Sequence, residues 1–224
     1  IYRDMAHYES AFARLFAEAA PDTNVVVSAT WPNAVALARA AKGRVQTYSS
    51  APGISADYTA RNVHFDIHGV RFEVMHGDRF VVEVVLPMSG SHNVENALGV
   101  FAAAESLGLT PQEISRGLSS FSGVKRRQEV RGEPSGILII DDFAHHPTAV
   151  RETIAAIARR YAPRPVWAVF EPRSNTSRRN IHQDDYAASF GDAHRVSIKI
   201  PERHDKIPVG EELDVVKVAA DLNR

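Results

Sequence analysis

The sequence contains no cysteine among its 224 residues. Disulfides, thiolate metal ligands and a thiol nucleophile are therefore excluded, and a cytoplasmic setting fits this absence. It also lacks any apolar run of roughly 18 residues, the length that a membrane span needs, and no signal-peptide pattern is visible. We expect neither a membrane span nor a membrane partner.

An excess of one charge is also missing, because 26 basic and 27 acidic side chains give a net charge of −1. This balance gives no support to nucleic-acid binding, although it is compatible with a local basic patch. We therefore expect no nucleic-acid partner. Hydrophobic residues at 44% and charged residues at 24% are typical of globular proteins and make disorder unlikely on composition.

The two glycine-rich nucleotide motifs are absent as well. The sequence has no G-x-x-x-x-G-K-[ST] and no G-x-G-x-x-G after a strand, which excludes a self-sufficient P-loop ATPase. It begins with Ile1 inside a helical pattern and ends at Arg224 within or just after another. We expect the chain to be a segment of a longer protein.

What is present is an alternation of helical and strand patterns, which predicts an α/β fold. Residues 63–86 differ, because their apolar residues alternate with period two around His68-Gly69 and Gly77-Asp78, which are typical of hairpin turns. This pattern predicts a three-stranded antiparallel meander. The other predicted elements before residue 120 are helices over 1–20, 32–41, 91–104 and 111–118 and strands over 25–27 and 44–48.

The short basic segment FSGVKRRQ, residues 121–128, predicts a domain boundary, which we place between residues 123 and 124. The strand and helix alternation then restarts. Residues 136–140 are apolar on both faces, as in a central strand of a parallel sheet. Further predicted elements are helices over 146–161 and 214–222 and strands over 166–170 and 195–200.

Polar residues at the start of the helix after the meander form a first candidate site. Asn93 and Asn96 are three apart, so their amides are expected on one side of the first turn. An amide both donates and accepts, as the edge of an adenine requires. Ordinary capping by Ser91 with solvated amides is the alternative.

Basic residues in the linker form a second candidate. Arginine binds phosphate through a planar fork, so Lys125, Arg126 and Arg127 are suited to holding an anion between two domains. The alternative is a solvated run of charge at a hinge.

Two further candidates follow predicted strands, where ligands bind in open α/β sheets. Asp141 and Asp142 precede His145 and His146. The carboxylates suit ribose hydroxyls, and the histidines suit an anion or proton transfer. A metal site is weakly supported, because the sequence shows no further ligands at a suitable spacing. The alternative is His146 as a helix N-cap. Residues 171–179 hold arginines among Ser, Asn and Thr, a composition that suits a loop that binds carboxylates. The alternative is a solvent-exposed loop without a binding role. Two loops after successive strands of one sheet would face the same crevice.

Four segments, taken in order, resemble the Mur ligases of peptidoglycan synthesis. They are LPMSGSHNVENALGVFAAA from residue 86, FSGVKRRQEVRGE from 121, IIDDFAHHPTAV from 139 and FEPRSNTSRR from 170. The last two most resemble the branch that recycles murein peptides, since the muramate–alanine branch typically has Tyr-Gly at Phe143-Ala144. The resemblance implies the later part of a central ATP-binding domain over 1–123 and a Rossmann-like, peptide-binding domain over 124–224.

The activity that the resemblance implies is ATP-dependent ligation of UDP-N-acetylmuramate to the murein tripeptide L-alanyl-γ-D-glutamyl-meso-diaminopimelate, with ATP and Mg²⁺ as cofactors. By motif position, His92, Asn93 and Asn96 would lie beside adenine, Asp142 near the ribose and Arg127 at the nucleotide phosphates as the catalytic residue. The residues that would bind the peptide are His145, Arg173, Ser174, Asn175 and Arg178.

The chain departs from the family pattern at its start. The UDP-sugar domain, the P-loop and the magnesium ligands would all precede Ile1, so we expect this segment alone to be inactive. Three alternatives stay open: a muramate–alanine ligase, a folylpolyglutamate synthase-like ligase, and a non-catalytic ligand-binding module.

Overall fold

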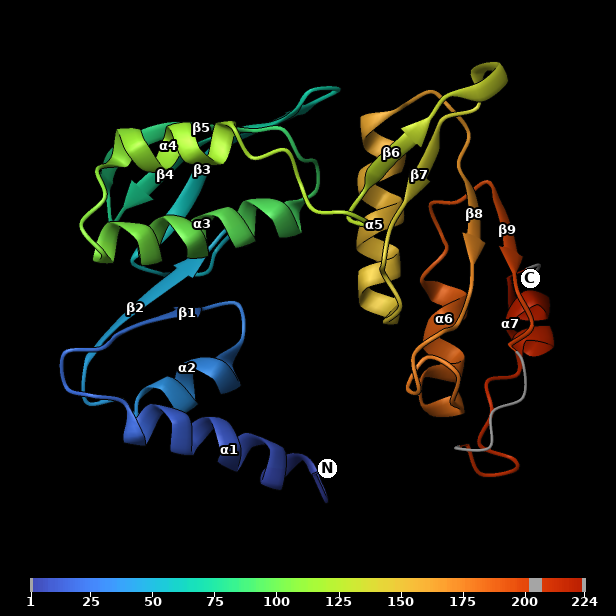
Figure 1. The fold of residues 1–224 in the computed structure, drawn as a ribbon, viewed down its shortest axis with the longest axis horizontal. Coiled ribbons are helices and arrows are strands. Elements are labelled where there is room, and N and C mark those ends of the chain that lie inside the picture. The colour runs from blue at the N-terminus through green and yellow to red at the C-terminus, as the bar shows by residue number, and fades with distance from the viewer. Residues whose placement is uncertain (1, 202–206, 223–224) are drawn as a thin grey trace. The chain divides into compact units, whose positions relative to one another are not determined.

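The structure is a computed structural model that describes residues 2–201 and 207–222. The chain forms two compact units, Ile1–Phe121 and Ser122–Arg224 (Figure 1). The predicted starting residue of the first helix, Ile1, lies outside the described residues. Among the described residues, no helix combines the length and apolar character that crossing a membrane requires.

One five-stranded sheet organises the N-terminal unit. Its strands β1 and β2 are parallel, β2 pairs briefly in parallel with β3, and β3, β4 and β5 form the predicted antiparallel meander. The meander therefore extends the parallel strands in a single sheet. The bounds are β1 Asn24–Ser28, β2 Arg44–Ser49, β3 Tyr58–Asp66, β4 Gly69–His76 and β5 Arg79–Leu86.

Of the two predicted hairpin turns, one lies where it was expected and the other is shifted by one residue. The turn at Gly77-Asp78 is confirmed, whereas the other turn consists of Ile67 and His68, so Gly69 opens β4 instead. Gly69 has φ +145°, and a Cβ there would lie 2.1 Å from the Leu86 carbonyl oxygen. Glycine is required at this position because the neighbouring strand passes so close.

Two helices cover one face of this sheet, α3 (Ser91–Ser106) and α4 (Pro111–Ser119) (Figure 1). Leu98 and Phe101 of α3 are fully buried in the core against Phe72. Thr110 caps α4 in a reciprocal capping box with Glu113.

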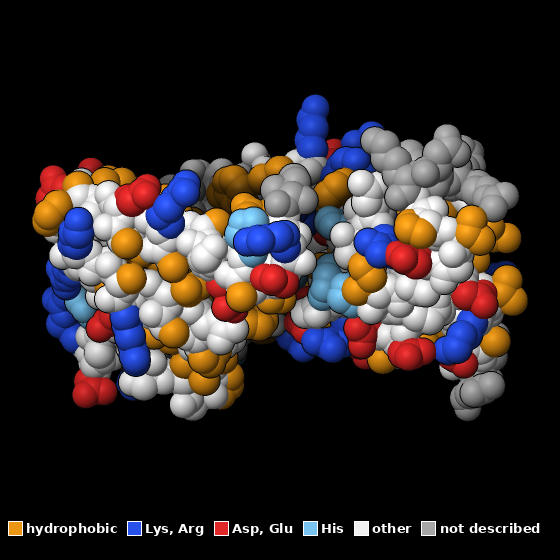
Figure 2. Space-filling model, turned by 90° about the horizontal axis from the view of Figure 1, so that it is seen from below, with side chains coloured by type: hydrophobic (Ala, Val, Ile, Leu, Met, Phe, Trp, Pro, Cys, Tyr) orange, Lys and Arg blue, Asp and Glu red, His pale blue; other side chains and the backbone are white. Residues whose placement is uncertain are grey.

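Two further helices, α1 (Met5–Glu18) and α2 (Pro32–Ala38), accompany β1, where Val25 and Ala38 form a smaller core cluster. α1 has no buried residue, and its aromatic side chains Tyr8 and Phe12 are exposed. On the face drawn in Figure 2, hydrophobic side chains occur in small groups between charged ones.

The C-terminal unit contains two short ladders, β6 with β7 antiparallel and β8 with β9 parallel. Phe170 of β8 packs on Tyr186 and Phe190 in its core. The bounds are β6 Glu129–Gly132, β7 Ile139–Asp141, α5 Pro147–Arg160, β8 Trp167–Phe170, α6 Gln183–Ala188, β9 Arg195–Ile198 and α7 Val215–Asp221, with short 3-10 turns at Pro134–Gly136 and Asn180–His182.

The prediction of a central parallel strand over 136–140 is wrong. In the described residues β7 begins at Ile139 and pairs only with β6, antiparallel. The turn Pro134–Gly136 returns the chain directly alongside β6, which gives the strand a local antiparallel partner. Within the predicted strand, Ile137 is 66% exposed and Ile139 47% exposed, whereas Leu138 and Ile140 are half-buried.

Candidate functional site

The start of α3 differs from the expectation of two exposed amides. Asn93 is only 7% exposed, and its Nδ2 donates to the Ser89 carbonyl oxygen at 2.7 Å, whereas Asn96 is exposed. The paired-amide prediction is therefore wrong, because the helix turns Asn93 toward the core. Capping by Ser91 is also wrong, since Gly90, with φ +107°, occupies the cap position. His92 is half-buried.

A carboxylate that the sequence analysis did not single out lies on the same helix. Glu95 accepts hydrogen bonds from Ser28 Oγ at 2.5 Å and from the Ser50 backbone N–H at 2.5 Å. These partners lie in loops far away in the sequence, so spacing within the motif gives no signal for them. The contacts join α3 to the ends of β1 and β2.

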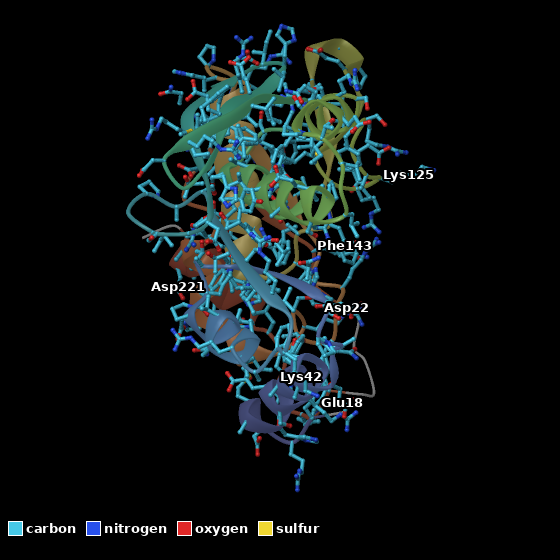
Figure 3. The ribbon with its side chains drawn as sticks, turned by 90° about the vertical axis from the view of Figure 1, so that its left-hand side faces the viewer. Glu18, Asp22, Lys42, Lys125, Phe143 and Asp221 are labelled. Atoms are coloured by element: carbon cyan, nitrogen blue, oxygen red, sulfur yellow. The ribbon has the colours of Figure 1, made fainter. Side chains whose placement is uncertain are left out.

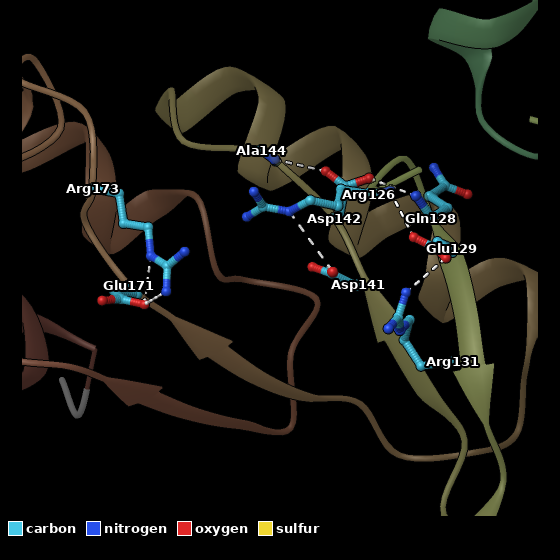
Figure 4. Close-up of polar contacts among 9 residues, drawn as sticks. All are labelled: Arg126, Gln128, Glu129, Arg131, Asp141, Asp142, Ala144, Glu171 and Arg173. Atoms are coloured by element: carbon cyan, nitrogen blue, oxygen red, sulfur yellow. Dashed lines mark hydrogen bonds and ion pairs between the residues drawn. The ribbon is translucent and has the colours of Figure 1, made fainter. Parts of the chain in front are cut away.

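In the C-terminal unit, the linker lies against the end of β7 (Figure 4). The Asp142 carboxylate accepts from the backbone N–H groups of Gln128 at 2.8 Å and Ala144 at 2.7 Å. The Phe143 N–H donates to the Arg126 carbonyl oxygen at 2.8 Å. Asp142 therefore holds the linker through Oδ2 and its own loop through Oδ1.

Phe143 has an exposed aromatic ring beside the linker arginines (Figure 3, where Phe143 and the linker residue Lys125 are labelled). The guanidinium carbons of Arg126 and Arg127 lie 5.0 and 5.8 Å from its ring centroid. Arg126 also reaches Asp141, with Nε 3.7 Å from Oδ2. Arg127 is exposed, so its charge is accessible to an anion.

The loop after β8 begins with a compact charge network. Glu171 accepts from Arg173 at 2.6 and 2.7 Å and from Lys199 at 2.9 Å. These hydrogen bonds, the one from Arg173 first, lower the pKa of Glu171 to about 2. A substrate carboxylate at Arg173 would therefore share the guanidinium with Glu171.

Internal hydrogen bonds hold the rest of this loop in one conformation. Ser177 is buried, and its Oγ accepts from the Ser174 N–H at 3.0 Å and donates to the Ser174 carbonyl oxygen. Arg178 Nε donates to the Pro172 carbonyl oxygen at 3.2 Å. Asn175 is exposed. The loop thus has a defined conformation that its sequence did not reveal.

The loop after β7 contacts the 3-10 turn and helix α6 that follow the loop after β8, although the two strands belong to separate ladders. The Tyr186 hydroxyl donates to the His145 carbonyl oxygen at 2.6 Å, and the rings of His146 and His182 meet edge to face. The expectation of one shared sheet is wrong, and the loop after β7 is instead joined to the start of α6. His182 and Tyr186 were not predicted, because the short helix α6 has too few turns to show a periodic pattern.

His146 is the N-cap of α5, as one reading of the sequence proposed, and its Nδ1 accepts from the Thr148 N–H at 3.3 Å. Burial lowers the pKa of His146, and the nearby charges of His182 and His145 lower it further. The histidine is therefore neutral and a hydrogen-bond acceptor near neutral pH.

The candidate residues fall into two groups, one in each unit. His92, Asn93 and Asn96 belong to the N-terminal unit, and the remaining candidates belong to the C-terminal unit. In the described part of the chain, no group of three or more His, Cys, Asp or Glu side chains is arranged to hold a metal ion.

Family models match both units of this chain. The Mur ligase middle domain matches residues 1–104, and the glutamate ligase domain of Mur ligases matches residues 126–216. The chain belongs to the Mur ligase family. This confirms the family resemblance of its motifs and the α/β class.

Three Mur ligases illustrate the similarity. The UDP-N-acetylmuramate–L-alanine ligase of Acaryochloris marina is 37% identical over 169 residues, 72% of this chain and 34% of the relative. The UDP-N-acetylmuramate–L-alanyl-γ-D-glutamyl-meso-2,6-diaminoheptandioate ligase of Escherichia coli is 41% identical over 131 residues, which are 58% of this chain and 29% of the relative. A murein peptide ligase from Psychrobacter arcticus matches with TM-score 0.64 and 30% identity, covering 100% of this chain and 45% of that one. The chain spans about a third of the length of these curated relatives.

Proposed function

We propose that this chain is part of a cytoplasmic, ATP-dependent ligase that joins UDP-N-acetylmuramate to the murein tripeptide L-alanyl-γ-D-glutamyl-meso-diaminopimelate. The observation that carries the proposal is that the loop after β7 contacts the start of α6, which directly follows the loop after β8, through Tyr186 with His145 and His146 with His182. These loops hold DDFAHHPTA and EPRSNTSRR, the two segments that most resemble the murein-recycling branch.

In this reaction ATP supplies a phosphoryl group that activates the muramate carboxylate, and the peptide amine then displaces phosphate to form the amide. Arg127, exposed beside Phe143, is the proposed catalytic residue that offsets charge on the nucleotide phosphates. Asn96 and His92 are proposed to contact adenine, with Asn93 fixing the loop before them through Ser89.

Asp142 is the proposed partner of the ATP ribose. Its carboxylate already accepts two backbone N–H groups, and a carboxylate has further lone pairs that can accept ribose hydroxyls. Holding the linker and binding the ribose are therefore compatible roles for this side chain.

The tripeptide is proposed to bind at the loop after β8, where its carboxylates suit arginine. When a peptide carboxylate binds Arg173, Lys199 continues to balance the charge of Glu171. The other proposed contacts are His145, Ser174, Asn175 and Arg178.

The residues of this chain do not fit a magnesium site, since the described residues contain no suitable cluster of ligands. We propose that any Mg²⁺ used in the reaction is held by other parts of the full-length protein. We assign the side chains of this chain no role in binding it.

A muramate–alanine ligase is the second candidate, favoured by the 37% identity to such a ligase over 72% of this chain. The test uses the full-length protein with ATP, Mg²⁺ and UDP-N-acetylmuramate, and measures ADP release with the tripeptide or with L-alanine. Release with the tripeptide supports the proposal, and release with L-alanine alone supports the second candidate. Release with neither amine contradicts both and favours a binding module.

A further inference from the structure

Glu95 connects α3 to two loops of the N-terminal unit. Its Oε1 accepts from Ser28 Oγ at 2.5 Å and from Thr30 Oγ1 at 3.1 Å. Its Oε2 accepts from Ser50, from the backbone N–H at 2.5 Å and from Oγ at 2.8 Å. Four neutral donors thus converge on one half-buried carboxylate.

These donors lie at the carboxyl ends of the parallel strands β1 and β2. Ser28 ends β1 and Ser49 ends β2, and the Ser49 and Thr30 hydroxyls are 2.9 Å apart. Both serines are buried. The charged residues Asp22 and Lys42 precede the same strands and so mark the other edge (Figure 3). Glu95 therefore holds α3 at the edge where α/β sheets bind ligands.

A second contact lies one helical turn further along the same face of α3. A Cβ at Gly99 would be 2.8 Å from Tyr48 Cζ, so the ring of this β2 residue packs directly on the helix. Burial raises the pKa of Tyr48, and the charge of Glu95 raises it further. Glu95 and Gly99 together fix how closely α3 approaches β2.

We infer that Glu95 is a positioning residue, which fixes the first turn of α3 so that His92 and Asn96 are presented to the adenine nucleotide. The inference rests on the proposed function. Gly90 at the cap position has no side chain, and Asn93 bonds to the neighbouring Ser89, so it is Glu95 that ties this turn to the ends of β1 and β2. A glutamine keeps the shape but not the charge: with its oxygen toward Ser50, its NH₂ faces the Ser28 and Thr30 hydroxyls, which must then accept instead of donating to a carboxylate.

The test measures ADP binding to the full-length protein by titration calorimetry, in the wild type and in Glu95→Gln. We expect the Kd for ADP to rise about tenfold, since hydrogen bonds to a charged group are lost, while the KM for UDP-N-acetylmuramate stays within about twofold. Glu105→Gln is the matched control, because Glu105 is on the same helix and accepts from the Tyr58 hydroxyl. It should leave ADP binding unchanged even if the Tm falls.

Wild-type ADP affinity in Glu95→Gln overturns the inference, whatever happens to its Tm. If Glu95→Gln does not fold, Ser50→Ala removes one donor, and we expect about threefold weaker ADP binding; unchanged binding there also overturns the inference. A wild-type protein that binds no ADP contradicts the proposed function itself. Wild-type binding combined with unaffected variants contradicts the positioning role alone.

Discussion

The imidazole rings of His146 and His182 lie edge to face, with their centroids 4.6 Å apart. His146 caps α5 and His182 directly precedes α6, so this contact joins the loop after β7 to the start of α6. Because positive charge on His182 repels a positive charge on His146, the contact favours the neutral form of His146.

The pH dependence of stability should reflect this pair. Burial, His182 and His145 lower the pKa of His146, and Asp185 opposes them only in part. The unfolded chain therefore takes up the proton at higher pH than the folded chain. The stability contributed by neutral His146 is present above the ordinary pKa of 6.5 and is lost as the pH falls through the lowered folded value.

The variant His146→Asn tests this, because asparagine also caps helices but does not titrate. We expect its free energy of unfolding, measured by urea titration between about pH 7.5 and 5, to fall less steeply with decreasing pH than that of the wild type. Identical slopes would show that His146 does not contribute to the pH dependence.

The charge network at Glu171 gives a second prediction. Its pKa of about 2 depends first on the hydrogen bond from Arg173 and next on that from Lys199. In a carboxyl-detected NMR titration, Arg173→Ala should raise the pKa of Glu171 toward the ordinary value of 4.5, and by more than Lys199→Ala does. A larger effect of Lys199→Ala would contradict this order of contributions.

The ordered loop after β8 gives a third prediction. Ser177→Ala removes the hydroxyl that holds Ser174, so the loop loses its fixed conformation. We expect the KM for the tripeptide to rise about tenfold, with the KM for UDP-N-acetylmuramate unchanged. Thr176→Ala, at an exposed neighbour, is the control and should resemble the wild type. Equal effects of the two variants would exclude a specific role for Ser177.

The two linker arginines give a fourth prediction. Both lie over Phe143, but Arg126 also reaches Asp141, whereas Arg127 is the proposed phosphate ligand. Arg127→Ala should lower kcat of the full-length ligase about a hundredfold, by analogy with removal of one preorganised donor, and Arg126→Ala by less than about tenfold. The reverse order would assign the phosphate contact to Arg126.

Much of the fold could be predicted because its signals are local. The period-two pattern of residues 63–86 predicted the meander, and the helix predicted over 111–118 matches α4 closely. Alternation alone did not identify the partner of β7, because the turn at Pro134–Gly136 supplied a nearby antiparallel strand. Apolar residues on both faces were read as burial, yet Ile137 is exposed.

The candidate site was less predictable for a related reason. Motif spacing located Asn93 and Asn96 but could not show that Asn93 turns inward to Ser89. The bonds of Glu95 to Ser28 and Ser50 span 67 and 45 residues, so they exist only in the folded chain. Local patterns therefore identified the segments of the site, and folding determined which side chains are accessible.

The central claim is the identity of the amine acceptor, and a competition experiment tests it most directly. Full-length protein is given ATP, Mg²⁺ and UDP-N-acetylmuramate with equal concentrations of the tripeptide and L-alanine, and the products are identified by mass spectrometry. The proposed function predicts UDP-N-acetylmuramoyl-tripeptide as the main product. UDP-N-acetylmuramoyl-L-alanine as the main product would contradict it.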